Sequence, residues 1–263
     1  MTFHHSFQAT FAGLVCLLLF FSASACVPMA SPPALLESTP TPTITATSTA
    51  TVIWFPPTDT PTPYPTPVVY PTSDYRPGLG STLFEDDFSE PDSWMLEKTS
   101  SGSVALGKNE LSLVISEPGA YEYTVRAEPI LTDFYAEITA NPNLCRGLDE
   151  YGLLVRYNSP VDFYRFSLSC DGQVRLDRLV NGKASSPQPW MQSGSVPPGA
   201  PSFSRLAVWA SGYEIRFFVN DQYQFSVNDP LLLKGNLGLF ARSASDTALT
   251  VNFSDLVVKE VTD

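Results

Sequence analysis

Histidine is nearly absent from this chain: only His4 and His5 occur among its 263 residues. A Ser-His-Asp triad or a Cys-His pair needs an imidazole beside its nucleophile, and no imidazole follows residue 5. The usual zinc sites use histidines or paired cysteines, and the chain has neither an HExxH nor a CxxC motif. These absences exclude the histidine-dependent hydrolases and the usual zinc proteins.

Charged residues are missing from the first 26 positions. The apolar run 11–21 is too short for a spanning helix, which needs about 20 apolar residues, but it has the length of a secretory h-region. Small residues precede Cys26, in an arrangement that resembles the cleavage box of bacterial lipoproteins. We therefore predict a signal peptide over residues 1–25, lipidation of Cys26 and a membrane-anchored, extracytoplasmic protein. The alternative is plain secretion with a leftover thiol at Cys26.

Regular secondary structure is not expected between residues 26 and 80, where Pro and Thr dominate. Thr-Pro repeats at 39–43 and 60–67 cannot donate a regular ladder of backbone hydrogen bonds and favour polyproline II. We predict a disordered but stiff linker that holds a domain on the order of 100 Å from its anchor, at about 3.1 Å per residue. The apolar stretch around Trp54 and Phe55 could dock on the domain or stay solvated.

No stretch of the remaining sequence has a helical period. Apolar residues instead alternate with polar ones, and turn residues recur every eight to twelve positions. The predicted strands are 151–157, 163–170, 173–180, 204–210, 213–219, 223–227, 237–242 and 249–258. Asp171-Gly172 and Asn181-Gly182 predict tight hairpin turns. We therefore predict an all-β sandwich over residues 81–263.

Pairing parity divides the strands between 151 and 180 into two faces. The expected core side is made of Leu153, Val155, Tyr157, Tyr164, Phe166, Leu168, Val174 and Leu176. The opposite side would carry Arg156, Arg165, Arg175 and Asp177.

Two cysteines remain in the predicted domain, Cys145 and Cys170, so only one pairing is possible. A disulfide that closes about 25 residues stabilises a fold by about 3 kcal/mol in the chain-entropy model. Such a bond persists in oxidising compartments, in agreement with export.

Several runs together resemble the concanavalin A-like lectin and glucanase superfamily, in particular the 3-keto-disaccharide hydrolase-like and laminin-G-like domains of bacterial lipoproteins. The runs are 84–94, 111–113, 151–157, 163–166, 171–176, 217–220, 235–240 and 251–256. The resemblance implies a two-sheet antiparallel jelly roll with a concave, sugar-facing sheet and paired terminal strands.

Sugar recognition needs flat aromatic faces and a few polar groups. We predict that Trp190, in a loop over 185–191, and Trp209 supply the aromatic faces, and that Arg156, Arg165 and Asp177 supply the polar groups. For each of them, core packing or surface ion pairing is the alternative.

An acidic run, 85–90, satisfies the E-x-D-x-x-E spacing that glucanases of the superfamily use for a retaining carboxylate pair. The run lies at the start of the domain and is followed directly by a proline. We therefore expect it to form a solvated turn or to help to bind a structural cation. We predict no cofactor other than a structural calcium ion, with Asp86, Asp87 and Asp255 as its candidate ligands.

The net charge of −12 argues against nucleic acid and anionic polymers as partners. We therefore predict an anchored module that binds carbohydrate or another envelope ligand without catalysis. The alternatives are a glycoside or 3-keto-glycoside hydrolase and a structural or protein-interaction module.

Overall fold

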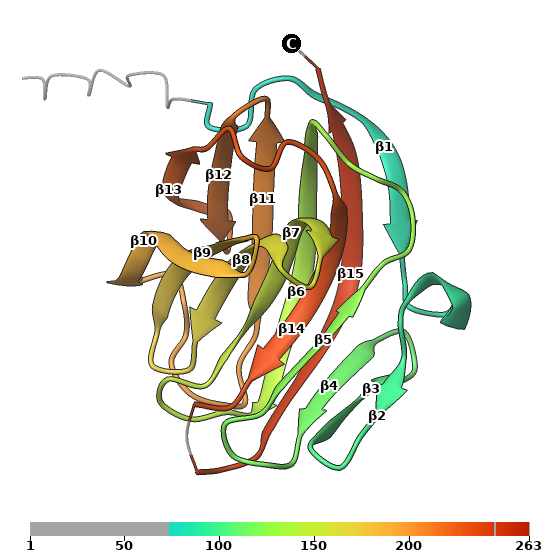
Figure 1. The fold of residues 1–263 in the computed structure, drawn as a ribbon, viewed down its shortest axis with the longest axis vertical. Coiled ribbons are helices and arrows are strands. Elements are labelled where there is room, and N and C mark those ends of the chain that lie inside the picture. The colour runs from blue at the N-terminus through green and yellow to red at the C-terminus, as the bar shows by residue number, and fades with distance from the viewer. Residues whose placement is uncertain (1–73, 245, 263) are drawn as a thin grey trace, which may run out of the picture. The chain divides into compact units, whose positions relative to one another are not determined.

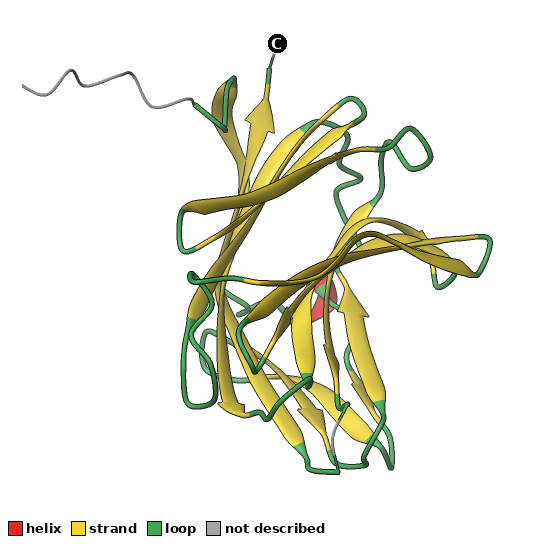
Figure 2. Ribbon diagram, turned by 90° about the vertical axis from the view of Figure 1, so that its left-hand side faces the viewer, coloured by secondary structure: helices red, strands yellow, loops and turns green. Residues whose placement is uncertain are grey.

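The computed structural model describes residues 74–244 and 246–262. They form two antiparallel sheets packed face to face, with one short 3-10 helix, η1 (Pro91–Ser93) (Figures 1 and 2). The all-β prediction is confirmed. The predicted signal peptide, Cys26 and the segment around Trp54 and Phe55 lie outside the described residues.

The larger sheet has nine strands in the order β13-β12-β11-β6-β15-β4-β3-β2, and β1 also pairs with β15. Its strands are β1 (Leu79–Asp86), β2 (Glu97–Lys98), β3 (Gly102–Leu106), β4 (Leu111–Ile115), β6 (Phe134–Leu144), β11 (Ser204–Ser211), β12 (Glu214–Val219), β13 (Gln222–Asn228) and β15 (Leu249–Val261). Because β1 and β15 pair, the predicted contact between the terminal strands is confirmed (Figure 1).

The smaller sheet has six strands in the order β10-β9-β8-β7-β14-β5. Its strands are β5 (Tyr121–Val125), β7 (Glu150–Ser159), β8 (Asp162–Ser169), β9 (Gln173–Val180), β10 (Lys183–Gln192) and β14 (Asn236–Arg242).

Two of the hairpins turn at pairs of residues that adopt a left-handed backbone conformation. Asn181 and Gly182 join β9 to β10 with φ of 50° and 73°, and Asn220 and Asp221 join β12 to β13 with φ of 49° and 64°. Two successive residues in the left-handed region match the twist of the flanking strands. The hairpin predicted from Asn181-Gly182 is therefore confirmed.

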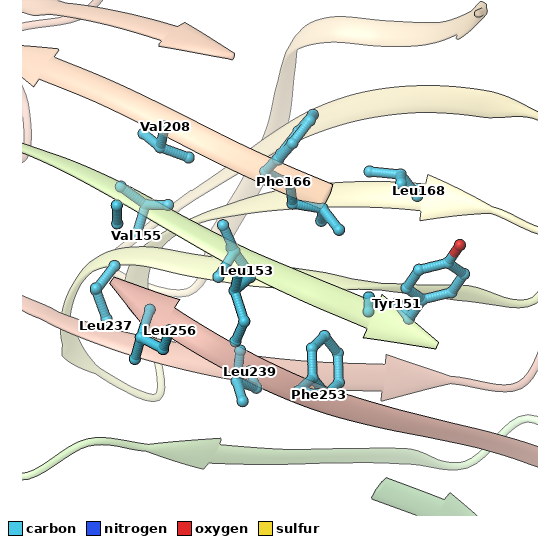
Figure 3. Packing of buried hydrophobic residues seen from close by; sticks show 14 of the residues in the cluster. Tyr151, Leu153, Val155, Phe166, Leu168, Val208, Leu237, Leu239, Phe253 and Leu256 are labelled. Atoms are coloured by element: carbon cyan, nitrogen blue, oxygen red, sulfur yellow. The ribbon is translucent and has the colours of Figure 1, made fainter. Parts of the chain in front are cut away.

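The core lies between the two sheets. Figure 3 shows side chains from both sheets in it, among them Leu153 and Val155 of β7, Phe166 of β8, Val208 of β11 and Phe253 of β15. All five are at most 1% exposed, and such burial stabilises the fold by about 1.5–3 kcal/mol for each side chain. The core residues predicted between 151 and 180 are all in this cluster except one.

The exception is Tyr157, and its cause is a β-bulge. Arg156 has a φ of 51°, and the register between β7 and β8 shifts between Val155 and Ser159. The extra residue reverses the alternation, so Tyr157 turns away from the core and its ring stacks on Phe163 at a centroid distance of 5.8 Å.

Trp190 lies in strand β10, and not in a loop over 185–191 as predicted. β10 is an edge strand, and its register with β9 slips on both sides of Gln188, next to Pro187 and Pro189. An edge strand tolerates proline because one side of its backbone needs no partner.

Residues 74–78, which we call the strap, precede β1. They cross the nine-stranded sheet on the side that faces away from the core. The ring of Tyr75 stacks on Tyr223 at 4.3 Å, and the guanidinium of Arg76 lies 4.7 Å from the ring centroid of Phe218. The linker, predicted to end at residue 80, therefore already contacts the sheet at its last residues.

Cys145 and Cys170 form the predicted disulfide, with their Cα atoms 5.8 Å apart. It ties the end of β8 to the segment that precedes β7. In the described part of the chain, no helix combines the length and apolarity needed to cross a bilayer.

Candidate functional site

The six-stranded sheet presents aromatic and charged side chains on the side that faces away from the core. Because successive residues of a strand point to opposite sides, the residues that alternate with core residues form this side, which we call the outer face. Its members include Tyr121, Tyr123, Glu150, Gly152, Leu154, Tyr157, Phe163, Arg165, Ser167, Arg175, Asp177, Leu179, Phe240 and Arg242.

Five aromatic rings form a continuous row on the outer face. From Phe163 the row runs through Tyr157, Tyr123 and Tyr121 to Phe240, with successive centroid distances of 5.8, 6.1, 5.6 and 5.8 Å. The two phenylalanines are buried, whereas the three tyrosines are half-buried. Part of each tyrosine ring therefore remains accessible.

Strand β5 supplies two of these tyrosines because it alternates strictly. Tyr121 and Tyr123 point outward, while Glu122 and Thr124 between and beside them are buried. Pairing with β14 places Tyr123 directly opposite Phe240. This cross-strand pair joins two aromatic residues that are more than a hundred positions apart in the sequence.

Asp177 anchors a charged network next to the aromatic row. Its carboxylate accepts hydrogen bonds from Arg165 at 2.6 Å, from Arg175 at 2.7 Å and from the hydroxyl of Ser186 at 2.6 Å. The guanidinium of Arg175 in turn lies 5.5 Å from the ring centroid of Trp190. The predicted site residues Arg165, Asp177 and Trp190 are thus brought together.

The network remains charged at neutral pH. Burial alone raises the pKa of Asp177, but the hydrogen bonds from Ser186 and Arg165 and the charge of Arg175 outweigh it and hold the pKa below its usual range. Burial lowers the pKa of Arg165, and the charges of Glu150 and Asp177 more than offset this, so its pKa is raised.

A second carboxylate, Glu150, lies on the same face and is 2% exposed. Its Oε1 accepts a hydrogen bond from Arg242 at 2.9 Å. Arg242 stands between Glu150 and Tyr121 in the pairing register of β7, β14 and β5. Burial raises the pKa of Tyr121, so its hydroxyl stays protonated at neutral pH.

Four polar atoms of the outer face are buried without a hydrogen-bond partner in the protein. They are the hydroxyl of Tyr121, Oε2 of Glu150, Nε of Arg165 and Oγ of Ser167. Buried polar groups are nearly always satisfied, so each of these exceptions calls for a structural explanation.

Arg156 is not part of this constellation. Its side chain is fully buried, and its guanidinium donates to the carbonyl oxygens of Leu232, Thr132 and Gly212 at 3.0, 3.1 and 2.9 Å. It therefore ties three loops together, and we do not retain it in the proposed site.

Trp209 lies in the other sheet, on strand β11. Its indole N–H donates to the carbonyl oxygen of Pro77 in the strap at 2.9 Å, and its ring packs under the guanidinium of Arg216 at 4.4 Å. It is 5% exposed, so little of its ring is left for a ligand.

The acidic residues near the start of the domain have other partners. Asp86 accepts hydrogen bonds from the indole of Trp94 at 3.0 Å and from Arg126 at 2.9 Å, and Asp87 accepts one from the backbone N–H of Ser89. Asp255 accepts one from its neighbour Ser254. Across residues 74–244 and 246–262, no group of three or more His, Cys, Asp or Glu side chains could hold a metal ion. Calcium stays a prediction.

Sequence reasoning missed the aromatic row and Glu150. The motif Tyr-Glu-Tyr at 121–123 carries a period-two signal that could have been used. The position of Tyr157 and the proximity of Phe240 had no local signal, because they depend on the bulge and on pairing between distant strands.

Solved structures with the same architecture include β-glucanases and a protein with a galectin-like fold. The chain is similar to the β-glucanase of Bacillus licheniformis, with 12% identity and a TM-score of 0.53 over 70% of this chain and 99% of that chain. It is also similar to a protein of unknown function with a galectin-like fold from Bacillus subtilis, with 13% identity and a TM-score of 0.54 over 70% of this chain and 99% of that one.

A third similar structure is the catalytic domain of an endo-1,3-β-glucanase (laminarinase) from Thermotoga petrophila, with 10% identity and a TM-score of 0.50 over 70% and 98% of the two chains. The fold is a concanavalin A-like jelly roll. No protein-family model and no curated protein matches the sequence. At these identities the likeness establishes the fold, and any function must be argued from the site.

Proposed function

We propose that this protein is an extracytoplasmic, lipid-anchored module that binds carbohydrate on the outer face of its six-stranded sheet, without catalysis. The observation that carries the proposal is the juxtaposition of three half-buried tyrosines with a buried arginine–carboxylate network on that face. Sugar rings have apolar faces that pack on aromatic rings and hydroxyls that need fixed polar partners, and this surface offers both.

The positions of the two buried carboxylates favour binding over hydrolysis. Asp177 is opposite Arg165, which is opposite Leu154, so Asp177 and Glu150 are two strands and four residues apart. At about 4.8 Å per strand and about 3.3 Å per residue, their backbones are roughly 16 Å apart. Arg165, on the strand between them, donates to Asp177 and is acted on by the charge of Glu150, whereas the two carboxyl groups of a glycosidase flank one sugar bond.

The electrostatics point the same way. A glycosidase general acid needs a raised pKa, whereas the pKa of Asp177 is lowered. Glu150 is paired with Arg242, so neither carboxylate is free to act as an acid. Their arrangement suits the task of holding arginines in place.

Affinity electrophoresis of residues 27–263 in gels that contain neutral or acidic polysaccharides tests the proposal. We expect retardation by at least one glycan. Tyr123→Ala and Tyr157→Ala should each weaken binding roughly fivefold, because a lost aromatic contact costs about 1 kcal/mol.

Tyr213→Ala is the matched control, since Tyr213 is 56% exposed in the turn between β11 and β12, in the other sheet. A folded protein that binds no glycan yet captures an envelope protein would favour the structural alternative. Release of reducing ends from a bound glycan would show that the site is catalytic.

A further inference from the structure

The accessible charges of the outer face are positive, although the chain as a whole carries a net charge of −12. Three arginines of this face, Arg165, Arg175 and Arg242, pair with only two carboxylates, Asp177 and Glu150. Each carboxylate side chain is 2% exposed, whereas Arg175 is 27% and Arg242 is 43% exposed. A ligand that approaches the face therefore meets guanidinium groups, while the carboxylates are buried in the sheet surface.

Arg242 keeps one edge of its guanidinium open. Its Nη1 donates to Oε1 of Glu150 at 2.9 Å, while Nε and Nη2 have no hydrogen-bond partner in the described part of the chain. These two nitrogens form one edge of the group, and such an edge binds both oxygens of a carboxylate through two parallel hydrogen bonds. A carboxylate of a ligand can therefore bind to Arg242 without breaking the ion pair with Glu150.

Arg175 offers a similar position on the other side of the face. Its Nε donates to Asp177 at 2.7 Å and its Nη2 to Ser186 at 3.2 Å, and among the described residues Nη1 has no hydrogen-bond partner. Asp177 also accepts a hydrogen bond from Arg165 at 2.6 Å, so it does not depend on Arg175 alone for its neutralisation. Arg175 can therefore share its charge with a ligand.

A half-buried aromatic ring lies next to each of these two arginines. Arg242 is directly opposite Tyr121 in the pairing of β14 with β5, and Trp190 lies beside Arg175. β14 and β9 are three strands apart in the six-stranded sheet (Figure 1), and the pairing register offsets Arg242 from Arg175 by two residues. At about 4.8 Å per strand and about 3.3 Å per residue, the two positions are roughly 16 Å apart. A chain of several sugars can reach both of them, whereas a single sugar cannot.

We propose that the outer face binds an acidic glycan whose carboxylates pair with Arg242 and Arg175 while its sugar rings pack on the aromatic side chains beside them. The inference rests on the proposed function and names the chemical class of its ligand. It also limits the conclusion drawn from the net charge, because at physiological salt charges are screened over about 8 Å and the local charge decides. The carboxylate of Asp171 lies beyond the strand ends, in the turn between β8 and β9.

The test compares glycans that differ only in their carboxylates. Polygalacturonate and alginate carry a carboxylate on every sugar, and chemical reduction of these groups gives neutral chains with the same linkages. Polyglutamate is a polyanion that has carboxylates but no sugar rings. In calorimetric titrations, we expect residues 27–263 to bind polygalacturonate or alginate at least tenfold more tightly than its reduced form or polyglutamate. That binding should weaken about fivefold or more when the salt concentration rises from about 50 mM to about 500 mM.

Arg242→Lys should weaken that binding roughly tenfold, because an ammonium group keeps a charge near Glu150 but lacks the edge with two N–H groups. Arg175→Gln should weaken it by a similar factor, and Asp177 keeps Arg165 as its partner in that variant. Arg205→Lys and Arg205→Gln are the matched controls, because Arg205 is 47% exposed on the other sheet. Both controls should bind as the parent does, and circular dichroism checks that every variant is folded.

The outcomes separate the inference from the proposed function. Equal binding of the reduced and the acidic glycans, or full binding by folded Arg242→Lys and Arg175→Gln, would overturn the acidic ligand while glycan binding by the module stands. Equal binding of polyglutamate would overturn it as well, since the sugar rings would then contribute nothing. Failure of the unmodified protein to bind any acidic or neutral glycan would remove the proposed function and the inference with it.

Discussion

Asp177 shows how single residues shape the outer face. It is 2% exposed on a sheet surface, where an unpaired carboxylate would be costly, and two arginines and a serine hydroxyl compensate for the lost hydration. Pairing parity alone predicted that Arg165, Arg175 and Asp177 share a face. It could not predict that Arg156 leaves that face, because one positive φ decides this.

Asp177→Asn should destabilise the domain by about 3 kcal/mol at pH 7, because it leaves two half-buried arginines without the buried carboxylate that pairs with them. The folded pKa of Asp177 is lowered, so its contribution is fully present above the unfolded pKa of about 3.9 and is lost as the pH falls through the folded value. The gap between parent and variant in urea unfolding should therefore shrink below about pH 4. Asp255→Asn, at an exposed carboxylate, should show no such gap. A gap that stays constant down to pH 2 would contradict this reading.

At the scale of elements, β5 and the strap decide what each sheet exposes. β5 pairs along β14 and adds two tyrosines to the outer face of the six-stranded sheet. The strap covers the opposite side of the molecule, where it packs on Phe218 and Trp209 of the nine-stranded sheet. Residues 74–78 therefore lie on the side of the domain away from the proposed ligand face.

Arg76→Ala should lower the free energy of unfolding by about 1–2 kcal/mol, because the guanidinium packs on Phe218 and hydrogen-bonds to Tyr135 and to the backbone of Asp221. Denaturant unfolding of residues 27–263 measures the loss, and Lys234→Ala is an exposed control. Glycan binding should be unchanged, since Arg76 lies on the other sheet. An unaltered unfolding midpoint would show that the strap does not stabilise the domain.

For the whole molecule, the prediction with the widest consequence is its location outside the membrane. The proposed lipid anchor would hold the jelly roll outside the membrane, where a disulfide such as Cys145–Cys170 persists. The anchor at Cys26 and most of the linker stay predictions from the sequence, since they lie outside the described residues.

Cys26→Ser should release the protein from the membrane fraction and abolish labelling by a radioactive fatty acid, since the acyl chains need the cysteine sulfur. Cell fractionation measures the membrane attachment, and mass spectrometry of the mature N-terminus detects the acyl chains. Cys16→Ser, within the predicted signal peptide, should leave both membrane attachment and labelling intact. An unmodified cysteine at the mature N-terminus would argue for simple secretion.

The sequence by itself determined the all-β class, the strands β7–β9 and β11–β15, the hairpin at Asn181-Gly182, the disulfide and the face shared by Arg165, Arg175 and Asp177. These features depend on a two-residue period and on turn residues whose backbone preferences are local. Only the tertiary structure decided that β5 joins β14, that the bulge at Arg156 moves Tyr157 outward, and that Trp209 is covered by the strap. Which strands become neighbours is set by the packing of the whole core, and no short segment of the chain contains that information.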